Sequence, residues 1–226
     1  MKFYLNKTPR SIQSLYKKFT WRFKTEKKEL YLTFDDGPIP EITPWVLKQL
    51  KKYQAKATFF CIGKNIKNHP EICKQLIQEG HTIGNHTYNH LNGWKNTIPE
   101  YLSNIEKAEN AISTTLNSLN CSIQHTKLFR PPYGKIKASQ TKNLQKKGYT
   151  IILWDVLSAD FDTTISSETC LKNVLKNTEN GSIIVFHDSE KAKEKLFYAL
   201  PKVLEYYSKK GYTFKKITSI SKNKNL

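Results

Sequence analysis

Two kinds of hydrophobic pattern alternate along this chain. Short runs rich in β-branched and aromatic residues occur at 30–34, 57–62, 128–130, 149–154, 182–186 and 212–217, with a weaker run near 81–84. Between them, apolar residues recur at helical spacing in the segments 70–79, 99–119, 168–177 and 201–209. Strands that are apolar throughout and alternate with helices are typical of parallel sheets covered by helices. The pattern therefore predicts one α/β domain whose strands form either a barrel or an open sheet.

A basic segment precedes this alternation. Residues 1–28 carry nine Lys and Arg residues and one acid, Glu26. Within the segment, four apolar residues fall at helical spacing: Ile12, Leu15, Tyr16 and Phe19. Such a stripe predicts a helix that packs on its own domain, and the alternative is a helix that lies on an anionic membrane surface. We therefore expect a basic N-terminal extension at 1–28 that packs on a single domain at 29–226.

The charge balance is strongly basic. The 226 residues include 37 Lys and Arg against 19 Asp and Glu, which gives a formal net charge of +18. A field of this sign attracts polyanions, but it also makes a well-solvated surface, and we favour the second interpretation. Because no recognisable module for reading nucleic acid accompanies the charge, we expect no specific nucleic-acid partner.

Targeting and cysteine patterns favour a cytoplasmic location. No apolar run approaches the roughly 20 residues of a membrane span, and no apolar stretch typical of a signal peptide follows the basic N-terminus. The cysteines form no C-x-x-C pair, which argues against a thiolate zinc site and a redox motif; they are Cys61, Cys73, Cys121 and Cys170. We expect free thiols in a reducing compartment, with peripheral attachment to an anionic membrane as an alternative.

Polar residues with catalytic potential follow the ends of the predicted strands. The carboxyl ends of parallel strands form the rim on which α/β folds build active sites. The residues found there are Asp35, Asp36, His86, His90, Arg130, Asp155, Asp160 and His187. This placement predicts an active site at that rim.

Part of this set is suited to hold a metal ion. His86 and His90 are four residues apart, so a helical turn would place both rings on one face. Two imidazoles and one carboxylate of the Asp35–Asp36 pair suit zinc or a similar divalent ion and leave a position for water. Arg130 and the cation would offset the repulsion between the adjacent carboxylates. The second carboxylate and His187 could then serve as base and acid in amide hydrolysis.

Three multi-residue motifs stand in order at these strand ends. They are Thr33-Phe34-Asp35-Asp36-Gly37-Pro38, His86-Thr87-Tyr88-Asn89-His90 and Arg130-Pro131-Pro132-Tyr133-Gly134. Together they resemble the first three motifs of the NodB-type polysaccharide deacetylases, carbohydrate esterase family 4. The resemblance spans residues 30–217 and implies a distorted (β/α) barrel of about seven parallel strands. It also implies a metal-dependent hydrolase that acts on acetylated carbohydrates.

The resemblance assigns the metal ligands. Asp36, His86 and His90 would hold a divalent cation, with Zn²⁺ as the first choice and Co²⁺, Ni²⁺ or Mn²⁺ as alternatives. The backbone N–H near Tyr133 would help to stabilise the oxyanion of the reaction.

The resemblance also assigns the proton-transfer groups. Asp35 would be the general base, and Arg130 would hold and orient its carboxylate. In Val185-Phe186-His187-Asp188, which resembles the fifth motif, His187 would be the general acid. Asp160 matches the aspartate that partners this histidine.

Several residues are expected to contact the substrate: Pro132, Tyr133, Trp154, Phe161 and Val185. Phe161 stands where the family commonly has Trp, and Val185 where Leu commonly lines the acetyl pocket. Both remain apolar, so these departures alter the shape of the pocket more than the reaction, and Trp154 could supply the aromatic wall. The remaining candidates match no motif and are expected to be structural or exposed: Asp155, His69, His81 and His125.

The leading hypothesis is an N-deacetylase of an amino-sugar-containing glycan or glycoconjugate. An O-acetyl esterase and a small-amide hydrolase remain alternatives, because the same chemistry serves all three. A non-catalytic carbohydrate-binding relative is a third hypothesis, although no base, ligand or acid is missing. The cytoplasmic expectation favours a lipid-linked or nucleotide-linked sugar as substrate. The sequence leaves the oligomeric state open.

Overall fold

The protein folds around one curled, parallel β-sheet. The computed structural model describes residues 4–119 and 126–218, so Cys121 and His125 lie outside the described residues. The order of the sheet is β5-β4-β3-β2-β1-β7-β6, with β8 paired to β1, and every pairing is parallel. The strands are β1 Glu29–Asp35, β2 Thr58–Cys61, β3 Thr82–Asn85, β4 Leu128–Phe129, β5 Thr150–Ile151, β6 Val156–Leu157, β7 Ile183–His187 and β8 Thr213–Phe214.

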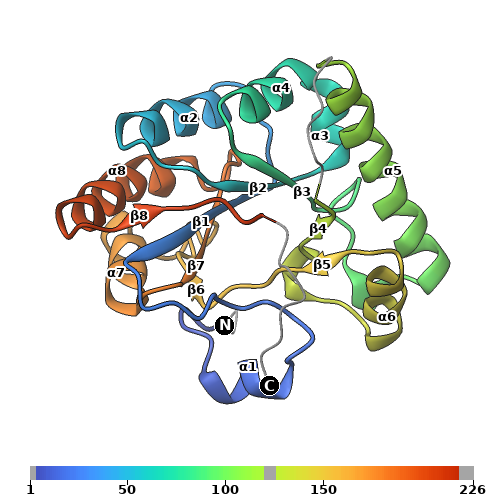
Figure 1. The fold of residues 1–226 in the computed structure, drawn as a ribbon, viewed down its shortest axis with the longest axis horizontal. Coiled ribbons are helices and arrows are strands. Elements are labelled where there is room, and N and C mark those ends of the chain that lie inside the picture. The colour runs from blue at the N-terminus through green and yellow to red at the C-terminus, as the bar shows by residue number, and fades with distance from the viewer. Residues whose placement is uncertain (1–3, 120–125, 219–226) are drawn as a thin grey trace.

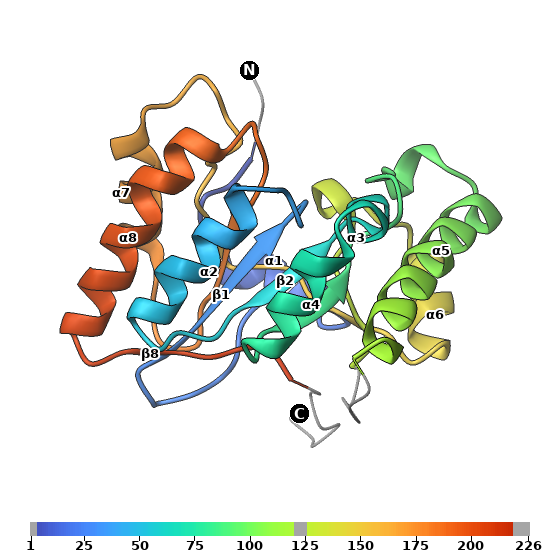
Figure 2. The ribbon, with the colours of Figure 1, turned by 90° about the horizontal axis from the view of Figure 1, so that it is seen from above.

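Helices surround the outside of this sheet (Figure 1). They are α1 Arg10–Leu15, α2 Ile42–Lys52, α3 Gly63–Asn68, α4 Pro70–Gln78, α5 Ile98–Asn117, α6 Ala138–Lys146, α7 Ser167–Asn177 and α8 Lys193–Lys209. Seen from above, α2 and α8 lie together at one end of the molecule, and α5 and α6 lie together at the other (Figure 2). The predicted distorted barrel of about seven parallel strands is confirmed.

The main core lies between the sheet and α2, α4, α7 and α8. Strand β1 is central, and Phe34 stacks on Phe59 of β2 with ring centroids 4.9 Å apart. Buried aliphatic side chains from the helices complete this cluster: Val46, Leu50, Leu76, Val174, Leu200 and Val203. Because β1 is buried on both faces, its last residue is held rigidly at the rim of the sheet.

The structure corrects some of the predicted elements. The last helix begins at Lys193 and not at Pro201, which lies inside it, because buried Leu196 and Ala199 continue the apolar face toward the N-terminus. Helices α2, α3 and α6 were not predicted. Strand β6 was also missed, because its two residues follow Asp155 and do not belong to a longer apolar run.

The N-terminal segment spans the opening between the two edge strands of the sheet. Thr20 pairs with Ile152 just beyond β5, and Lys7 pairs with Val156 of β6. The backbone hydrogen bonds include Leu153 N to Thr20 O at 2.8 Å and Leu157 N to Asn6 O at 2.9 Å. Figure 1 shows this segment, in blue, lying along the side where β5 and β6 end. Both edges are thereby covered, which removes backbone groups that would otherwise be open to pairing.

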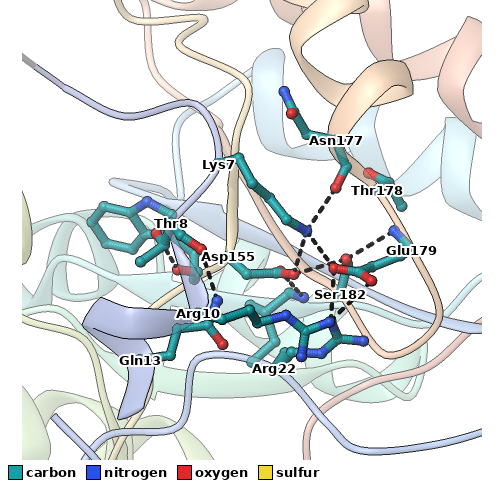
Figure 3. Close-up of polar contacts among 12 residues, drawn as sticks. Lys7, Thr8, Arg10, Gln13, Arg22, Asp155, Asn177, Thr178, Glu179 and Ser182 are labelled. Carbon is teal, nitrogen blue, oxygen red and sulfur yellow. Dashed lines mark hydrogen bonds and ion pairs between the residues drawn. The ribbon is translucent and has the colours of Figure 1, made fainter. Parts of the chain in front are cut away.

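A buried carboxylate anchors the N-terminal segment to the sheet (Figure 3). Asp155 accepts hydrogen bonds from Lys7 Nζ at 3.0 Å, Ser182 Oγ at 3.0 Å and the backbone N–H of Ile183 at 2.9 Å. Glu179 lies beside it and pairs with Lys7 at 2.8 Å and with Arg22 at 2.7 Å. Burial raises the pKa of Asp155, whereas the adjacent Lys7 ammonium lowers it. These contacts give Asp155 a structural role.

The predicted amphipathic stripe is not buried as a unit. Helix α1 ends at Leu15 and buries none of its residues, and Leu15 and Tyr16 are 75% and 51% exposed. Phe19 alone of the stripe packs against a core cluster, that of Tyr101 and Phe129. Contact of the exposed residues with an anionic membrane stays a prediction. None of the described helices has the length and hydropathy needed to cross a membrane.

Candidate active site

The end of β1 presents two adjacent carboxylates to different partners. Asp35 is the last residue of β1 and pairs with Phe60 of β2 and His187 of β7. Asp36 follows with φ of 85°, a conformation that costs energy for a residue other than glycine. Its backbone carbonyl accepts a hydrogen bond from Asn65 Nδ2 at 2.7 Å, which helps to hold it there. The two carboxylates therefore serve separate parts of the site.

Asp36 lies with His86 and His90 in one cluster. Oδ1 of Asp36 is 3.7 Å from Nε2 of His86 and 3.2 Å from Nε2 of His90. The predicted helical turn is wrong, because residues 86–90 form a loop in which Thr87 and His90 have φ of 64° and 57°. The hydrogen bond from Thr87 N to Asn85 Oδ1 shapes the start of this loop. A loop with left-handed backbone at Thr87 and His90, and not a helical turn, therefore brings the two histidines together.

Several observations show that this cluster suits a divalent metal ion. One ligand atom from each residue lies within 4.8 Å of the others, and tetrahedral zinc bonds of roughly 2.0–2.1 Å would place donors ~3.3 Å apart. Oδ1 of Asp36 is buried, and no described residue forms a hydrogen bond with it. Such an atom is costly unless a cation or another donor satisfies it.

The protonation state of His86 also fits a metal ligand. Its Nδ1 lies 2.7 Å from the carbonyl oxygen of Arg130. A carbonyl only accepts, so Nδ1 carries the proton and the lone pair of Nε2 points toward Asp36. Burial and the neighbouring His90 lower the pKa of His86 well below its usual value, which keeps the ring neutral.

Asp35 is held by Arg130. Nη1 of Arg130 donates to Oδ1 of Asp35 at 2.7 Å and to Oγ1 of Thr33 at 2.7 Å. The guanidinium is fully buried and also donates to the carbonyls of Ile152 and Leu153, at 3.2 and 3.0 Å. Burial raises the pKa of Asp35, and the charges of Arg130 and His187 partly offset this. A carboxylate with a raised pKa is a stronger base than a free one.

Asp160, in the loop after β6, holds the side chain of His187 at the end of β7. Nδ1 of His187 lies 2.7 Å from Oδ1 of Asp160, and its backbone N–H donates to Oδ2 at 2.7 Å. Burial alone would lower the pKa of His187, but the charge and hydrogen bond of Asp160, aided by Asp36 and Asp35, raise it to about 9. The ring is therefore an imidazolium at neutral pH and can donate a proton.

The residues expected to contact substrate lie around these groups. The hydroxyl of Tyr133 is 3.1 Å from Nδ1 of His90, and its side chain is 60% exposed. Trp154 lies over the Arg130 guanidinium, 5.7 Å from its Cζ to the ring centroid. Phe161 packs edge-on against His187 at 5.1 Å. Pro132 and Val185 are buried, and Val185 shares the face of β7 that carries His187.

Two other predicted candidates lie elsewhere. His81 is buried, its Nδ1 accepts a hydrogen bond from the N–H of Ala57 at 3.1 Å, and burial lowers its pKa to about 4. His69 lies 3.8 Å from Glu71 at the start of α4. These contacts explain both residues without a role in the site.

The structure adds two residues that the sequence analysis did not single out. Asp188 is fully buried and accepts hydrogen bonds from Gly37 N at 3.1 Å and Thr43 Oγ1 at 2.6 Å. Burial raises its pKa to about 8. Asp188 thereby links the loop after β1 to the strand that bears His187. Its place next to His187 in the sequence could have pointed to this role.

The second added residue is Tyr4, in the N-terminal segment. Its hydroxyl donates to Oδ2 of Asp162 at 2.6 Å, and its ring packs edge-on against Phe161 at 5.5 Å. The loop that carries Asp160 is thus supported from the N-terminal segment. No sequence signal could reveal a contact between residues 158 positions apart.

Comparison with known proteins decides the family. Residues 22–152 match the polysaccharide deacetylase family. The chain belongs to this family. This polysaccharide deacetylase is 36% identical over 209 residues to a peptidoglycan-N-acetylglucosamine deacetylase of Bacillus cereus, with 91% of this chain and 94% of that protein covered. It is also 34% identical over 167 residues to a chitooligosaccharide deacetylase of Azorhizobium caulinodans, with 74% and 77% covered.

A solved structure supports the same assignment. The deacetylase superposes with a TM-score of 0.82 on the crystal structure of a peptidoglycan N-acetylglucosamine deacetylase in complex with 4-naphthalen-1-yl-N-oxidanyl-benzamide. The sequences are 35% identical, and the alignment covers 93% of this chain and 95% of that one. The predicted family and enzyme class are confirmed: the chain is a deacetylase of carbohydrate esterase family 4 that acts on an acetylated carbohydrate.

Proposed function

We propose that this deacetylase removes N-acetyl groups from an amino-sugar-containing glycan, with a divalent cation held by Asp36, His86 and His90. The observation that carries the proposal is the buried Oδ1 of Asp36, which lies between two histidine nitrogens and has no hydrogen bond to any described residue. The names of the relatives support the N-acetyl specificity, since both act on N-acetylglucosamine or chitooligosaccharide. Zinc is the first candidate, because two imidazoles and one carboxylate are ligands that it favours.

When bound, the cation lowers the pKa of water and polarises the acyl oxygen. Asp35 accepts a proton from the attacking water, while Arg130 keeps its carboxylate ionised and aimed. The water oxygen bonds to the acyl carbon, and the bond from that carbon to the sugar nitrogen breaks. The backbone N–H near Tyr133 stabilises the oxyanion.

His187 completes the reaction as the general acid. Its imidazolium donates a proton to the departing nitrogen, so that acetate and a free amino sugar are released. Asp160 keeps the ring protonated and fixes its orientation through Nδ1. The raised pKa values of Asp35 and His187 suit a base and an acid that work in the same pH range.

The test is acetate release from N-acetylglucosamine oligomers by the zinc-supplemented enzyme. We expect turnover by the wild type and a fall in kcat of about 10²–10⁴-fold for Asp35→Asn and for His187→Ala. Glu205→Gln, an exposed change on α8, is the matched control and should leave kcat unchanged. Wild-type rates in both variants would contradict the assigned roles.

The alternatives give different outcomes in the same assay. Acetate released from acetylated xylan but not from the oligomers would identify an O-acetyl esterase. Release from small cyclic amides alone would identify an amide hydrolase. Binding of the oligomers without release from any substrate would identify a non-catalytic relative.

A further inference from the structure

A pocket of about 470 Å³ opens beside the candidate metal site. It shares His90 and Tyr133 with that site, so a glycan whose acetyl group lies at Asp36 has its next sugar in reach of the pocket. The rest of the wall comes from the loop after His90 and the turn after Tyr133, and includes Lys95 and Lys135. These two loops touch closely, since a Cβ added to Gly93 would lie 2.5 Å from the carbonyl oxygen of Lys135.

The wall of this pocket includes two lysines, Lys95 and Lys135. No carboxylate is among its described lining residues. Within the described part of the chain, neither Lys95 nor Lys135 forms an ion pair. Nearby Lys137 is different, because its ammonium donates to the carbonyl of Asn96 at 2.7 Å. The two lysines of the pocket wall therefore have no carboxylate partner among the described residues.

An exposed aromatic ring lies beside one of these lysines. Trp94 is among the exposed large hydrophobic residues, and Nζ of Lys135 lies 5.3 Å from its ring centroid. Its indole N–H donates to the carbonyl of Ile136 at 3.2 Å, which fixes the ring against the neighbouring loop. A flat ring fixed in this way offers an apolar surface on which a sugar can stack, with an ammonium group beside it.

We infer that this pocket is a subsite for a sugar that carries an anionic group, a carboxylate or a phosphate, next to the sugar that is deacetylated. The inference rests on the proposed function, because it places the acetyl group at Asp36. Lys95 and Lys135 pair with the anion, and the side chains of Asn92 and Asn96 add polar groups to the pocket wall. The subsite thus selects acidic glycans over neutral ones of equal length.

The test compares three probes of equal length: a neutral N-acetylglucosamine oligomer, one with a neighbouring uronic acid, and one with a neighbouring sugar phosphate. We expect the wild type to show kcat/KM about tenfold higher for an acidic probe, the gain from two half-exposed charge pairs. Lys95→Gln combined with Lys135→Gln should remove this preference, so that the variant turns over the acidic probes no faster than the neutral one. The preference should also shrink as salt is raised.

A matched variant separates the local effect from the overall charge. Lys172→Gln combined with Lys176→Gln removes the same charge from α7, at a surface pocket that includes no residue of the candidate metal site. It should keep the full preference. Equal loss of preference in both double variants, or preserved preference in the Lys95/Lys135 variant, would overturn the inference.

Binding measured by calorimetry distinguishes this inference from the proposed function. Lysine-dependent binding of an acidic probe without acetate release would support the subsite and contradict the proposed deacetylation. Acetate release from the neutral probe with no preference for either acidic probe would support the deacetylation and contradict the subsite. A preference for the phosphate probe alone would identify a phosphorylated glycan, and one for the uronic acid alone a carboxylated glycan.

Discussion

Nη1 of Arg130 lies 2.7 Å from Oδ1 of Asp35, and both side chains are almost completely buried. The ring of Phe60 lies 4.1 Å from the guanidinium carbon. The planar fork of Arg130 supplies donors to four acceptors at once, which a lysine ammonium could not reach. The pair therefore stabilises the interior of the barrel and also orients the carboxylate of the proposed base.

Arg130→Lys is expected to lower both stability and activity. At least two buried acceptors lose their donors, at ~1–3 kcal/mol each, so the free energy of unfolding should fall by about 2–6 kcal/mol. Denaturant unfolding and kcat on N-acetylglucosamine oligomers measure the two effects. Arg10→Lys is the control, because Arg10 is exposed and should change stability by no more than ~0.5 kcal/mol. A stable, fully active Arg130→Lys variant would contradict this role.

The pKa of His187 predicts the alkaline limb of the activity profile. Its ordinary value is about 6.5, and it is raised to about 9 in the fold, so the proton needed for catalysis is lost as pH rises through about 9. This shift stabilises the folded state fully below about pH 6.5, and the stabilisation is lost as the pH rises from there through about 9. Asp160→Asn removes the charge that raises the pKa and should move the limb of kcat down by ~1–3 pH units.

The profile is measured at constant, saturating zinc, because a bound cation also favours the deprotonated ring. Glu205→Gln serves as the control and should not move the limb. An Asp160→Asn variant with the wild-type limb would show that Asp160 does not set the pKa of His187.

Metal removal is expected to abolish turnover and reduce thermal stability. A ligand that binds only the folded state stabilises it by ~2.7 kcal/mol at 100 times its Kd, so chelation should lower Tm and zinc should restore it. His90→Ala should weaken zinc binding by more than the ~10–100-fold that loss of an outer partner costs. His69→Ala, outside the site, should bind zinc normally by calorimetry. Chelator-resistant activity would argue against the metal site.

The anchor at Asp155 is expected to support the whole sheet. Asp155→Ala leaves the N–H of Ile183 and the hydroxyl of Ser182 without their acceptor, so stability should fall by ~1–3 kcal/mol. Denaturant unfolding measures the change. Glu205→Ala removes an exposed pair on α8 and should cost no more than ~0.5 kcal/mol. An equal loss of unfolding free energy in the two variants would contradict a stabilising role for the contacts of Asp155.

Tyr4 is expected to influence activity although it lies outside residues 22–152, the segment that matches the family. Tyr4→Phe keeps the ring against Phe161 and removes the hydrogen bond to Asp162. A bond to a charged group contributes ~1.5–3 kcal/mol, so even partial loosening of the loop should lower kcat by about tenfold. Tyr16→Phe makes the same change at an exposed residue of the segment and should leave kcat unaltered. The alkaline limb should shift only in the Tyr4 variant, because the loop that Tyr4 supports positions Asp160.

The spacing of apolar residues along the sequence was sufficient to predict the long elements. Helix α5 carries a long apolar face, so its span was predicted closely, and the structure adds a capping box of Thr97 and Glu100 at its start. Strand β6 and helix α3 are too short to show a period, and Pro201 was taken for a helix start although Leu196 and Ala199 already continue that face. Short elements depend on the surrounding sheet and not on their own residues.

By itself, the sequence determined the alternation of strands and helices, the family and the residues that carry chemical potential, because periodicity and motifs are local properties. Only the tertiary structure decided how these residues meet. The left-handed backbone at Asp36 and His90 brings three ligands to one point, and partners more than 100 positions away brace Asp155 and the loop of Asp160. Such contacts form where separate strands converge, and no pattern within a single segment encodes them.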